Sequence, residues 1–477
     1  MTDEDARIAF YRAIAKKANE AVGGQGELTS IDVGSNGNFP YNYMDSNNVF
    51  VASAWEYLNR LCVPQGRDHI KFSDIQVGNR YEEYLGHLSY RLSSKDQSAL
   101  NANHIYAQES AQQVVAQYEE LYGTITPEMM TSVGIEGNAK IDYIINYKLG
   151  QWAKPNKLQL STGNIKELTD QLPNAPSSVV QLLLPLIVQY LGSSTEVLGI
   201  VNASGNARQR ITSLKTNTRH PSADNGGLTT NDNKVHIKYN ISQQPDQIVA
   251  DLKNLNRTFS VTMNAERFDE NKAHLAVDGN VGGDVDWGFF TVGGGVSVNY
   301  QLDKLSTSTD KIEITLDFTG LCDIRISPSP FQQDTQQGWW DPEPIQNALH
   351  NRKPDGSGYK DVSGYILEPF SEDIKVFGVL ERLVVANFPT IKISYSAGKA
   401  SELAQSLTER SELTASVFGI PLFSAEQEYS EAKIEKHSSG EGFTVSMKQS
   451  DPTGSALGQR AYVVGAWVDR SFDVERP

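Results

Sequence analysis

Three segments in which apolar and polar residues alternate decide the fold predicted for this chain: FSVTMNA (259–265), VSVNYQL (296–302) and IEITLDF (312–318). Successive side chains of an extended strand point to opposite faces, so each segment is predicted to be a strand with one apolar face and one polar face. Glycine-rich segments at 279–283 and 293–295 and a polar segment at 306–310 separate these strands. The region Asn256–Ile326 is therefore predicted to be an antiparallel meander.

The length and the composition are those of a globular protein. A chain of 477 residues is expected to form about two to four domains. The hydrophobic share of 39% and the charged share of 21% are close to globular averages. A net charge of −16 argues against a nucleic-acid partner, because binding to phosphates requires clustered Lys and Arg. The same charge weakens attachment to anionic membrane surfaces.

The two cysteines, Cys62 and Cys322, are too few for a disulfide framework. Neither has a His or Cys neighbour at the spacing of a metal site. We predict two buried, reduced thiols, and a single Cys62–Cys322 bridge is the alternative.

The first residues are acidic and lead into an amphipathic helix rather than into the apolar core of a signal peptide. The longest apolar run, Val179–Leu191, is shorter than the roughly 20 residues that a membrane span needs. The chain is therefore predicted to be made in the cytoplasm without a usual signal peptide. Release by a non-Sec route is the alternative.

Apolar stripes at three- and four-residue steps, together with capping and stop residues, predict a largely helical first part of the chain. Helices are predicted at 3–22, 47–62, 94–122, 127–131, 140–153, 164–171 and 177–191. The predicted fold class is α+β, with an N-terminal helical bundle followed by a mainly antiparallel β domain, a meander or sandwich. The predicted domains are a helical domain at 1–204, a polar linker or surface loop at 205–234, and a β-rich domain at 235–477 with a Pro/Gln/Trp insertion at 327–373.

Motifs of known enzyme classes are missing from the sequence. It contains no phosphate-binding loop, no dinucleotide-binding GxGxxG, no HExxH and no GxSxG. The eight histidines are scattered singly, so the chain is predicted to be non-enzymatic, with no cofactor and no metal. Asp284 and Asp286 begin a DxDxG fragment, a weak candidate for calcium, but the remaining ligands of a calcium loop do not follow. A plain turn is favoured there.

Two adjacent tryptophans, Trp339 and Trp340, lie in the polar insertion. Adjacent indoles can form a platform for a sugar ring, which makes these residues candidates for a carbohydrate-binding site. The favoured interpretation is structural: a long loop needs an anchor, and a buried indole provides one.

The meander permits two interpretations. An ordinary antiparallel sheet buries its apolar face and exposes its polar face. The soluble precursor of a β-hairpin pore has the same alternation, because in a barrel the apolar face meets lipid and the polar face lines water. The candidates for membrane insertion are Trp287, Phe289, Phe290, Val296, Val298 and Tyr300. Asp284 and Asp286 oppose insertion, because they lie in the same turn.

Three functional hypotheses follow. The first is a membrane-active, pore-forming toxin-like protein with an insertable hairpin within 256–326; it forms homo-oligomers and binds a lipid bilayer or a cell-surface glycan. The second is a structural protein that self-assembles into homo-oligomers or filaments. The third is a carbohydrate-binding module that uses Trp339 and Trp340. The order of elements is similar in layout to several insecticidal and pore-forming proteins, and this resemblance implies the first hypothesis without assigning a role to any residue.

Overall fold

The computed structural model describes residues 3–23, 28–32, 38–65, 68–136, 139–154, 158, 160, 164–269, 272–277, 285–287, 311–350, 356–361, 377–396, 431–438, 442–448, 459–470 and 472. The chain divides into two compact units. Unit 1 consists of Met1–Gly86, Ser213–Gln346 and Gly364–Pro477, and unit 2 consists of His87–Thr212 and Asn347–Ser363.

Unit 1 combines helices with most of the strands. Its helices are α1 (Asp3–Val22), α2 (Ala52–Leu58), α3 (Val77–Gly86) and α10 (Pro245–Lys253). Its strands are β1 (Ser30–Asp32), β2 (Phe39–Pro40), β3 (Arg60–Pro64), β4 (His69–Gln76), β6 (Leu228–Thr229), β7 (Val235–His236), β8 (Tyr239–Ile241), β9 (Thr258–Asp269), β10 (Lys272–Val277), β11 (Val285–Trp287), β12 (Lys311–Thr319), β13 (Cys322–Pro328), β15 (Val379–Ala386), β16 (Thr390–Ser396), β17 (Glu431–Lys436), β18 (Gly442–Lys448) and β19 (Arg460–Asp469).

Unit 2 is mainly helical. Its elements are β5 (Leu88–Arg91), α4 (Ser94–Tyr122), α5 (Pro127–Thr131), α6 (Lys140–Asp142), the π-helical turn η2 (Tyr143–Lys148), α7 (Leu149–Trp152), α8 (Ile165–Gln171), the π-helical turn η3 (Val179–Leu183) and β14 (Gly358–Asp361). Two helices have residues in both units: α9 (Leu184–Arg219) and α12 (Glu343–His350).

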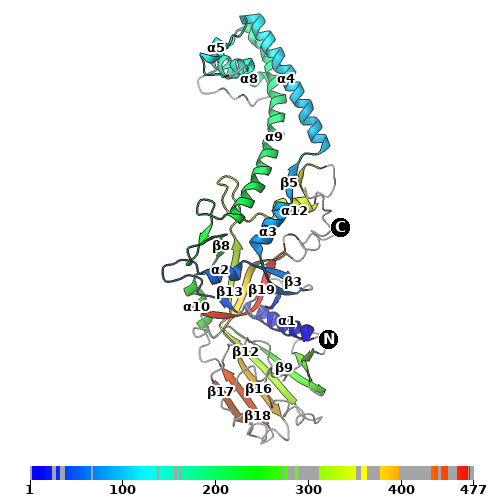
Figure 1. Ribbon diagram of the computed structural model, residues 1–477, viewed down its shortest axis with the longest axis vertical. Coiled ribbons are helices and arrows are strands. Elements are labelled where there is room, and N and C mark those ends of the chain that lie inside the picture. Colours follow the sequence, from blue (N-terminus) through cyan, green and yellow to red (C-terminus); the bar gives the residue numbers. More distant parts are fainter. Residues whose placement is uncertain are drawn as a thin grey trace. The chain divides into compact units, whose positions relative to one another are not determined.

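The main sheet of unit 1 has seven strands in the order β11-β10-β9-β12-β16-β18-β17. All its neighbouring strands are antiparallel. Figure 1 shows β9, β12, β16, β18 and β17 as one continuous layer. Each of these strands has the period-two pattern, so the register brings apolar residues of neighbouring strands onto one face and polar residues onto the other.

A second sheet has five strands in the order β2-β19-β15-β13-β8. The chain passes from one sheet to the other at β12–β13 and at β15–β16. Gly320 turns the first connection with φ +67°, and a Cβ atom there would lie 2.1 Å from the Leu252 carbonyl oxygen, so only glycine fits. The buried Asn387 stabilises the connection between β15 and β16. Its backbone N–H donates to the Thr319 carbonyl oxygen at 2.9 Å, and its side-chain amide donates to the Leu252 carbonyl oxygen at 2.7 Å.

Unit 2 has a compact end, which contains α5 and α8, and a stem, which is formed by the first half of α4 and by the part of α9 that belongs to this unit. In Figure 1 α5 and α8 lie where α4 ends and α9 begins. The core of this end is formed by 15 buried residues, among them Tyr118, Ile144 and Leu184. Local capping defines α4: the Ser93 hydroxyl accepts from the Asp96 N–H, and Gly123 at φ +86° ends the helix.

The α+β class with mainly antiparallel sheets is confirmed, and so are the predicted helices at 3–22, 94–122 and 127–131. The N-terminal helical bundle is not confirmed, because α1, α2 and α3 belong to unit 1 together with the large sheets. Residues 205–219 are not a linker: they are the last turns of α9, with Ile211 and Leu214 buried. The helix predicted at 47–62 is shorter, and Cys62 lies in β3.

Candidate functional site

The apolar face of the main sheet is built from residues that pair directly across the strands. One row contains Met263, Ile314, Ile393, Val445 and Ile434, and a second contains Val261, Leu316, Ile391 and Met447. All but Ile434 are buried, and Ile434 packs against the same cluster. In the neighbouring row Tyr395 is 3% exposed, and burial raises the pKa of its hydroxyl. This face is therefore a dry core.

The opposite face of the same strands is polar throughout its described part. One row contains Thr262, Thr315, Lys392, Ser446 and Lys433, and the next contains Asn264, Glu313, Ser394, Thr444 and Glu435. Every one of these side chains is at least partly exposed to water. Most carry hydroxyl or amide groups, and the charged ones include both signs. This hydroxyl-rich surface, called the polar face below, is the first candidate site.

Hydrogen bonds and ion pairs connect the strands across the polar face. The Ser260 hydroxyl donates to the Asp317 carboxylate at 2.6 Å, and the Lys392 Nζ lies 2.7 Å from the other oxygen of that carboxylate. The hydroxyls of Ser394 and Thr444 lie 3.0 Å apart on neighbouring strands. Such cross-strand pairs stabilise a register without removing the face from water.

Helix α1 covers the apolar face. Its residues Phe10, Ile14 and Ala18 are buried in the same cluster as the strand residues. Contacts at the helix surface add to this: the Arg12 guanidinium lies 2.5 Å from the Asp68 carboxylate, and Tyr11 stacks on His69 with ring centroids 6.1 Å apart. Movement of α1 is one step toward uncovering the apolar rows of the sheet.

A buried hydroxyl–imidazole pair lies under α1. The Ser30 Oγ and the His69 Nδ1 are 2.7 Å apart, and both residues are 1% exposed. The Ser30 hydroxyl also donates to the Asp68 carbonyl oxygen at 2.9 Å, so its proton is directed away from the imidazole. A serine nucleophile needs a base that takes its proton and an open approach for a substrate. This pair has neither and acts as a structural hydrogen bond.

Most of the predicted insertion residues lie outside the part of the chain that the structure describes: Phe289, Phe290, Val296, Val298 and Tyr300. Trp287 is in β11, where it pairs with Ala273 of β10. Of the weak calcium candidates, Asp286 pairs with His274 in the same two strands, and Asp284 is outside the described residues. The described residues contain no group of three or more metal-ligating side chains.

The structure buries both tryptophans of the proposed ligand platform. Trp339 is 2% exposed and Trp340 is 9% exposed. The Trp339 indole N–H donates to the Lys238 carbonyl at 2.8 Å, and its ring packs edge-on against Tyr81 and Tyr239. Little of either ring is open to a sugar, and the geometry is that of an anchor.

Both cysteines are free thiols in the described structure. Burial raises the pKa of Cys62 to about 12. Burial also raises the pKa of Cys322, whose thiol donates to the Asp251 carboxylate at 3.5 Å. Thiols held in the protonated form are poor nucleophiles and poor metal ligands, so neither contributes a reactive site.

The exposed apolar surface of unit 2 is the second candidate site. Seven of the ten large hydrophobic side chains exposed among the described residues belong to unit 2: Ile105, Tyr106, Tyr122, Ile165, Leu182, Leu198 and Val201. By length and composition, one helix among the described residues could cross a membrane, Val179–Arg219. Of its most apolar 18-residue window, 22% is buried. Exposed apolar surface of this kind favours contact with another surface.

Polar contacts hold the stem together. The Asn103 amide of α4 donates to the Glu196 carboxylate of α9 at 2.7 Å, and the Gln189 amide donates to the Tyr106 hydroxyl at 2.5 Å. The first half of α4, up to Glu109, has no buried residue. The sequence offered no signal for this exposure, because an amphipathic helix normally buries its apolar stripe.

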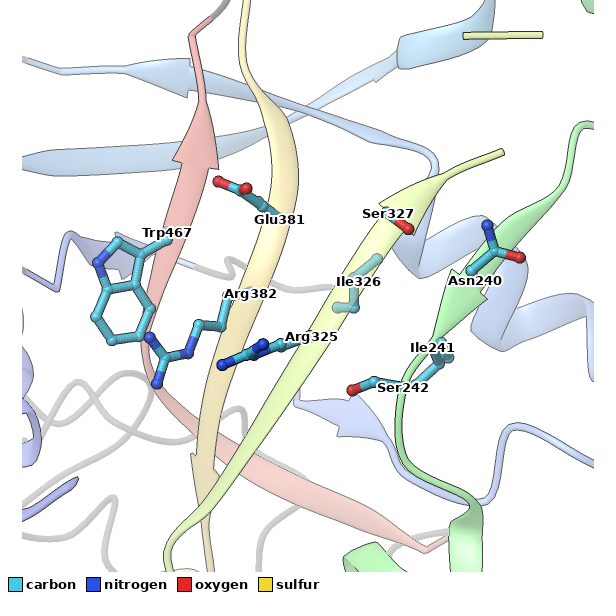
Figure 2. A pocket seen from close by; sticks show the side chains of 9 residues that line it. All are labelled: Asn240, Ile241, Ser242, Arg325, Ile326, Ser327, Glu381, Arg382 and Trp467. Atoms are coloured by element: carbon cyan, nitrogen blue, oxygen red, sulfur yellow. The ribbon is translucent and has the colours of Figure 1, made fainter. Parts of the chain in front are cut away.

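The third candidate is an open cavity of about 530 Å³ on the five-stranded sheet. Figure 2 shows the side chains that line it, with Arg325, Arg382 and Trp467 on neighbouring strands. Sequence reasoning did not find these residues, because they are brought together only by strand pairing.

Comparison of the chain with protein-family models, with curated proteins and with solved structures finds no match.

Proposed function

We propose that this protein is a non-enzymatic, membrane-active protein of the pore-forming type, which oligomerises and exposes the polar face of its main sheet to a water-filled lumen. One observation carries the proposal: in two neighbouring rows on each face, β9, β12, β16, β18 and β17 place apolar residues on one side of the sheet and polar residues on the other. The exception among the described residues is Lys436 at the end of β17, which is exposed and pairs with Phe443 on the apolar side. A transmembrane barrel requires this separation, with apolar side chains toward lipid and polar ones toward water.

The lengths of β9 and β12 support the proposal, whereas β16, β18 and β17, with 7, 7 and 6 residues, are shorter than one membrane crossing. A transmembrane strand needs about 9–11 residues. β9 has 12 residues and β12 has 9, and they pair as direct antiparallel neighbours although the chain between them is long. β10 pairs with β9 on its other side, and β11 pairs with β10, so two strands of the same sheet lie between β9 and β12 in the sequence.

The apolar stem of unit 2 supports a role at a surface. Its exposed side chains, such as Ile105 on α4 and Leu198 on α9, are 56% and 57% exposed. Burial of these groups against lipid or against other copies would be favourable by about 25 cal/mol per Å² of apolar area. Action on a bilayer outside the producing cell would also require release from that cell.

Liposome dye release tests the proposal. The purified chain should release calcein from neutral phosphatidylcholine vesicles. Release from vesicles that contain anionic lipid should be slower at low salt, because the chain carries a net charge of −16.

The variant Arg12→Ala should accelerate release, by up to about fivefold, since it removes an exposed ion pair that holds α1 and such pairs contribute up to about 1 kcal/mol. Arg80→Ala is the matched control, because it removes the exposed Arg80–Glu83 pair of α3 at 3.0 Å. Vesicles that stay sealed with both the parent chain and Arg12→Ala would refute the proposal.

Self-assembly without a membrane is the second candidate, and the exposed stem favours it. The charged residues Lys433 and Glu435 on β17, at one end of the described sheet, oppose assembly by strand pairing at that edge. Electron microscopy without lipid separates the candidates. Filaments or lattices would support a scaffold, whereas rings that form only with lipid would support the pore.

A further inference from the structure

The cavity on the five-stranded sheet has a charge pattern that ordinary sheet packing does not require. Arg325 of β13 and Arg382 of β15 are direct cross-strand partners. Like charges in such a position destabilise a sheet unless something neutralises them. The Asp323 carboxylate neutralises one of them, because it pairs with the Arg382 guanidinium through two parallel hydrogen bonds.

Arg382 is further fixed by an aromatic ring. Its guanidinium carbon lies 3.9 Å from the ring centroid of Trp467, its partner on β19. Two of its N–H groups are used by Asp323 and one of its faces by the indole. These contacts hold the Arg382 side chain in place, so it lines the cavity but is not free to bind a ligand through all of its N–H groups.

Arg325 differs from Arg382. Its side chain is exposed, and it has no ion pair with any residue that the structure describes. Figure 2 shows its side chain extending from β13 toward the side of Arg382. A guanidinium offers five N–H donors in a planar fork, which matches the two oxygens of a carboxylate.

A strand irregularity brings an acceptor to the same place. The pairing of β15 with β19 shifts register between Leu380 and Arg382, so Glu381 is an extra residue in the strand. Such bulges redirect a side chain, and here the exposed Glu381 lines the cavity beside Arg382. Asn240, Ser242 and Ser327 add amide and hydroxyl groups on the other side.

We propose that this cavity binds a sugar that carries a carboxylate, of the sialic or uronic acid type. Arg325 would hold the carboxylate, while Glu381 and Asn240 would bind ring hydroxyls and the edge of Trp467 would contact the apolar side of the sugar. A volume of about 530 Å³ is in the range of small-ligand sites. A phosphate dianion fits less well than a monocarboxylate, because it brings a second negative charge next to the Glu381 carboxylate.

The assignment goes beyond the proposed membrane activity and does not depend on it. It names the same ligand class as the hypothesis for Trp339 and Trp340, but at a different place, and it involves an indole that is only partly buried. Trp467 packs against the core cluster on one side and against Arg382 on the other.

Titration calorimetry of the full chain with four probes tests the assignment: methyl N-acetylneuraminide, glucuronic acid, methyl galactoside and inorganic phosphate. At least one acidic sugar should bind. The neutral sugar should bind at least about tenfold more weakly, because it lacks the charge-assisted hydrogen bond, which contributes about 1.5–3 kcal/mol. Phosphate should also bind at least about tenfold more weakly, because it lacks the ring that contacts Glu381, Asn240 and Trp467 and carries a second negative charge. Arg325→Ala should weaken binding by a similar factor. Arg257→Ala, at another exposed arginine of unit 1, should leave binding unchanged.

Thermal unfolding of each variant checks that the fold is intact. Binding of neither acidic sugar, equal binding of the neutral sugar or of phosphate, or undiminished binding by a folded Arg325→Ala chain would each overturn the assignment.

Discussion

Truncation of Leu316 to alanine is expected to lower the free energy of unfolding of unit 1 by about 2–5 kcal/mol. Leu316 is fully buried in the centre of β12, where it pairs with Val261 and Ile391. The truncation removes apolar contacts and leaves a cavity between two neighbouring strands that cannot close completely. Urea unfolding followed by tryptophan fluorescence measures the effect, since five of the six tryptophans belong to unit 1.

The neighbouring residue supplies the control. Thr315 lies on the polar face and is partly exposed, so Thr315→Ala should change the free energy of unfolding by no more than about 0.5 kcal/mol. Equal losses for the two variants would mean that both faces of β12 are buried. The polar face would then not be available to line water.

Truncation of Trp339 to alanine is the second large effect, with an expected loss of about 3–5 kcal/mol in the free energy of unfolding. The ring fills the space between Tyr81, Tyr239 and Trp340, with centroid distances of 5.9, 5.5 and 5.6 Å. Its removal also leaves the Lys238 carbonyl without the indole donor. Denaturant unfolding followed by circular dichroism is the suitable measurement, because the substitution itself changes the fluorescence.

Trp339→Phe separates the two contributions. It retains most of the apolar volume and loses the hydrogen bond, so it should cost about 1–3 kcal/mol. A Trp339→Ala chain of unchanged stability that loses binding to sugars would instead identify the residue as a ligand platform and contradict its role as an anchor.

Short sequence patterns correctly predicted those helices and strands whose structure is set by neighbouring residues in the chain. The alternation in 259–265 and 312–318 identified β9 and β12 and their buried faces. In a half-buried strand every second side chain points to the core, so the apolar residues of the pattern are the buried ones. Gly123 correctly marked the end of α4. The cap predicted at its beginning, Asp96, was wrong: Asp96 lies in the first turn, and its N–H donates to the hydroxyl of the true cap, Ser93.

The polar end of α9 was missed for a physical reason. Residues 205–219 are rich in Asn, Thr and Arg, and only Ile211 and Leu214 mark a buried stripe. The stripe continues with a polar residue, Asn217, whose amide donates to the carbonyls of Gln336 and Gly338 at 2.9 and 2.6 Å. A buried amide satisfied by a distant loop has no signature in the local sequence.

The candidate sites were predicted only in part. The polar rows of β9 and β12 follow from the alternation, but their continuation through Lys392 and Ser446 depends on long-range strand pairing. The cavity depends on the same kind of pairing, because Arg325, Arg382 and Trp467 are far apart in the sequence. Register between distant strands is set by the packed sheets and not by any one segment.

Reversal potentials of single channels in planar bilayers test the central claim most directly, namely that the polar face lines a water-filled lumen. Glu313 is exposed on that face, so Glu313→Lys should shift the selectivity of the channel toward anions under a salt gradient. Glu109→Lys makes the same charge change on the exposed surface of α4 and should leave the reversal potential unchanged. Channels whose selectivity ignores Glu313→Lys, or the absence of any channels from the parent chain, would contradict the account.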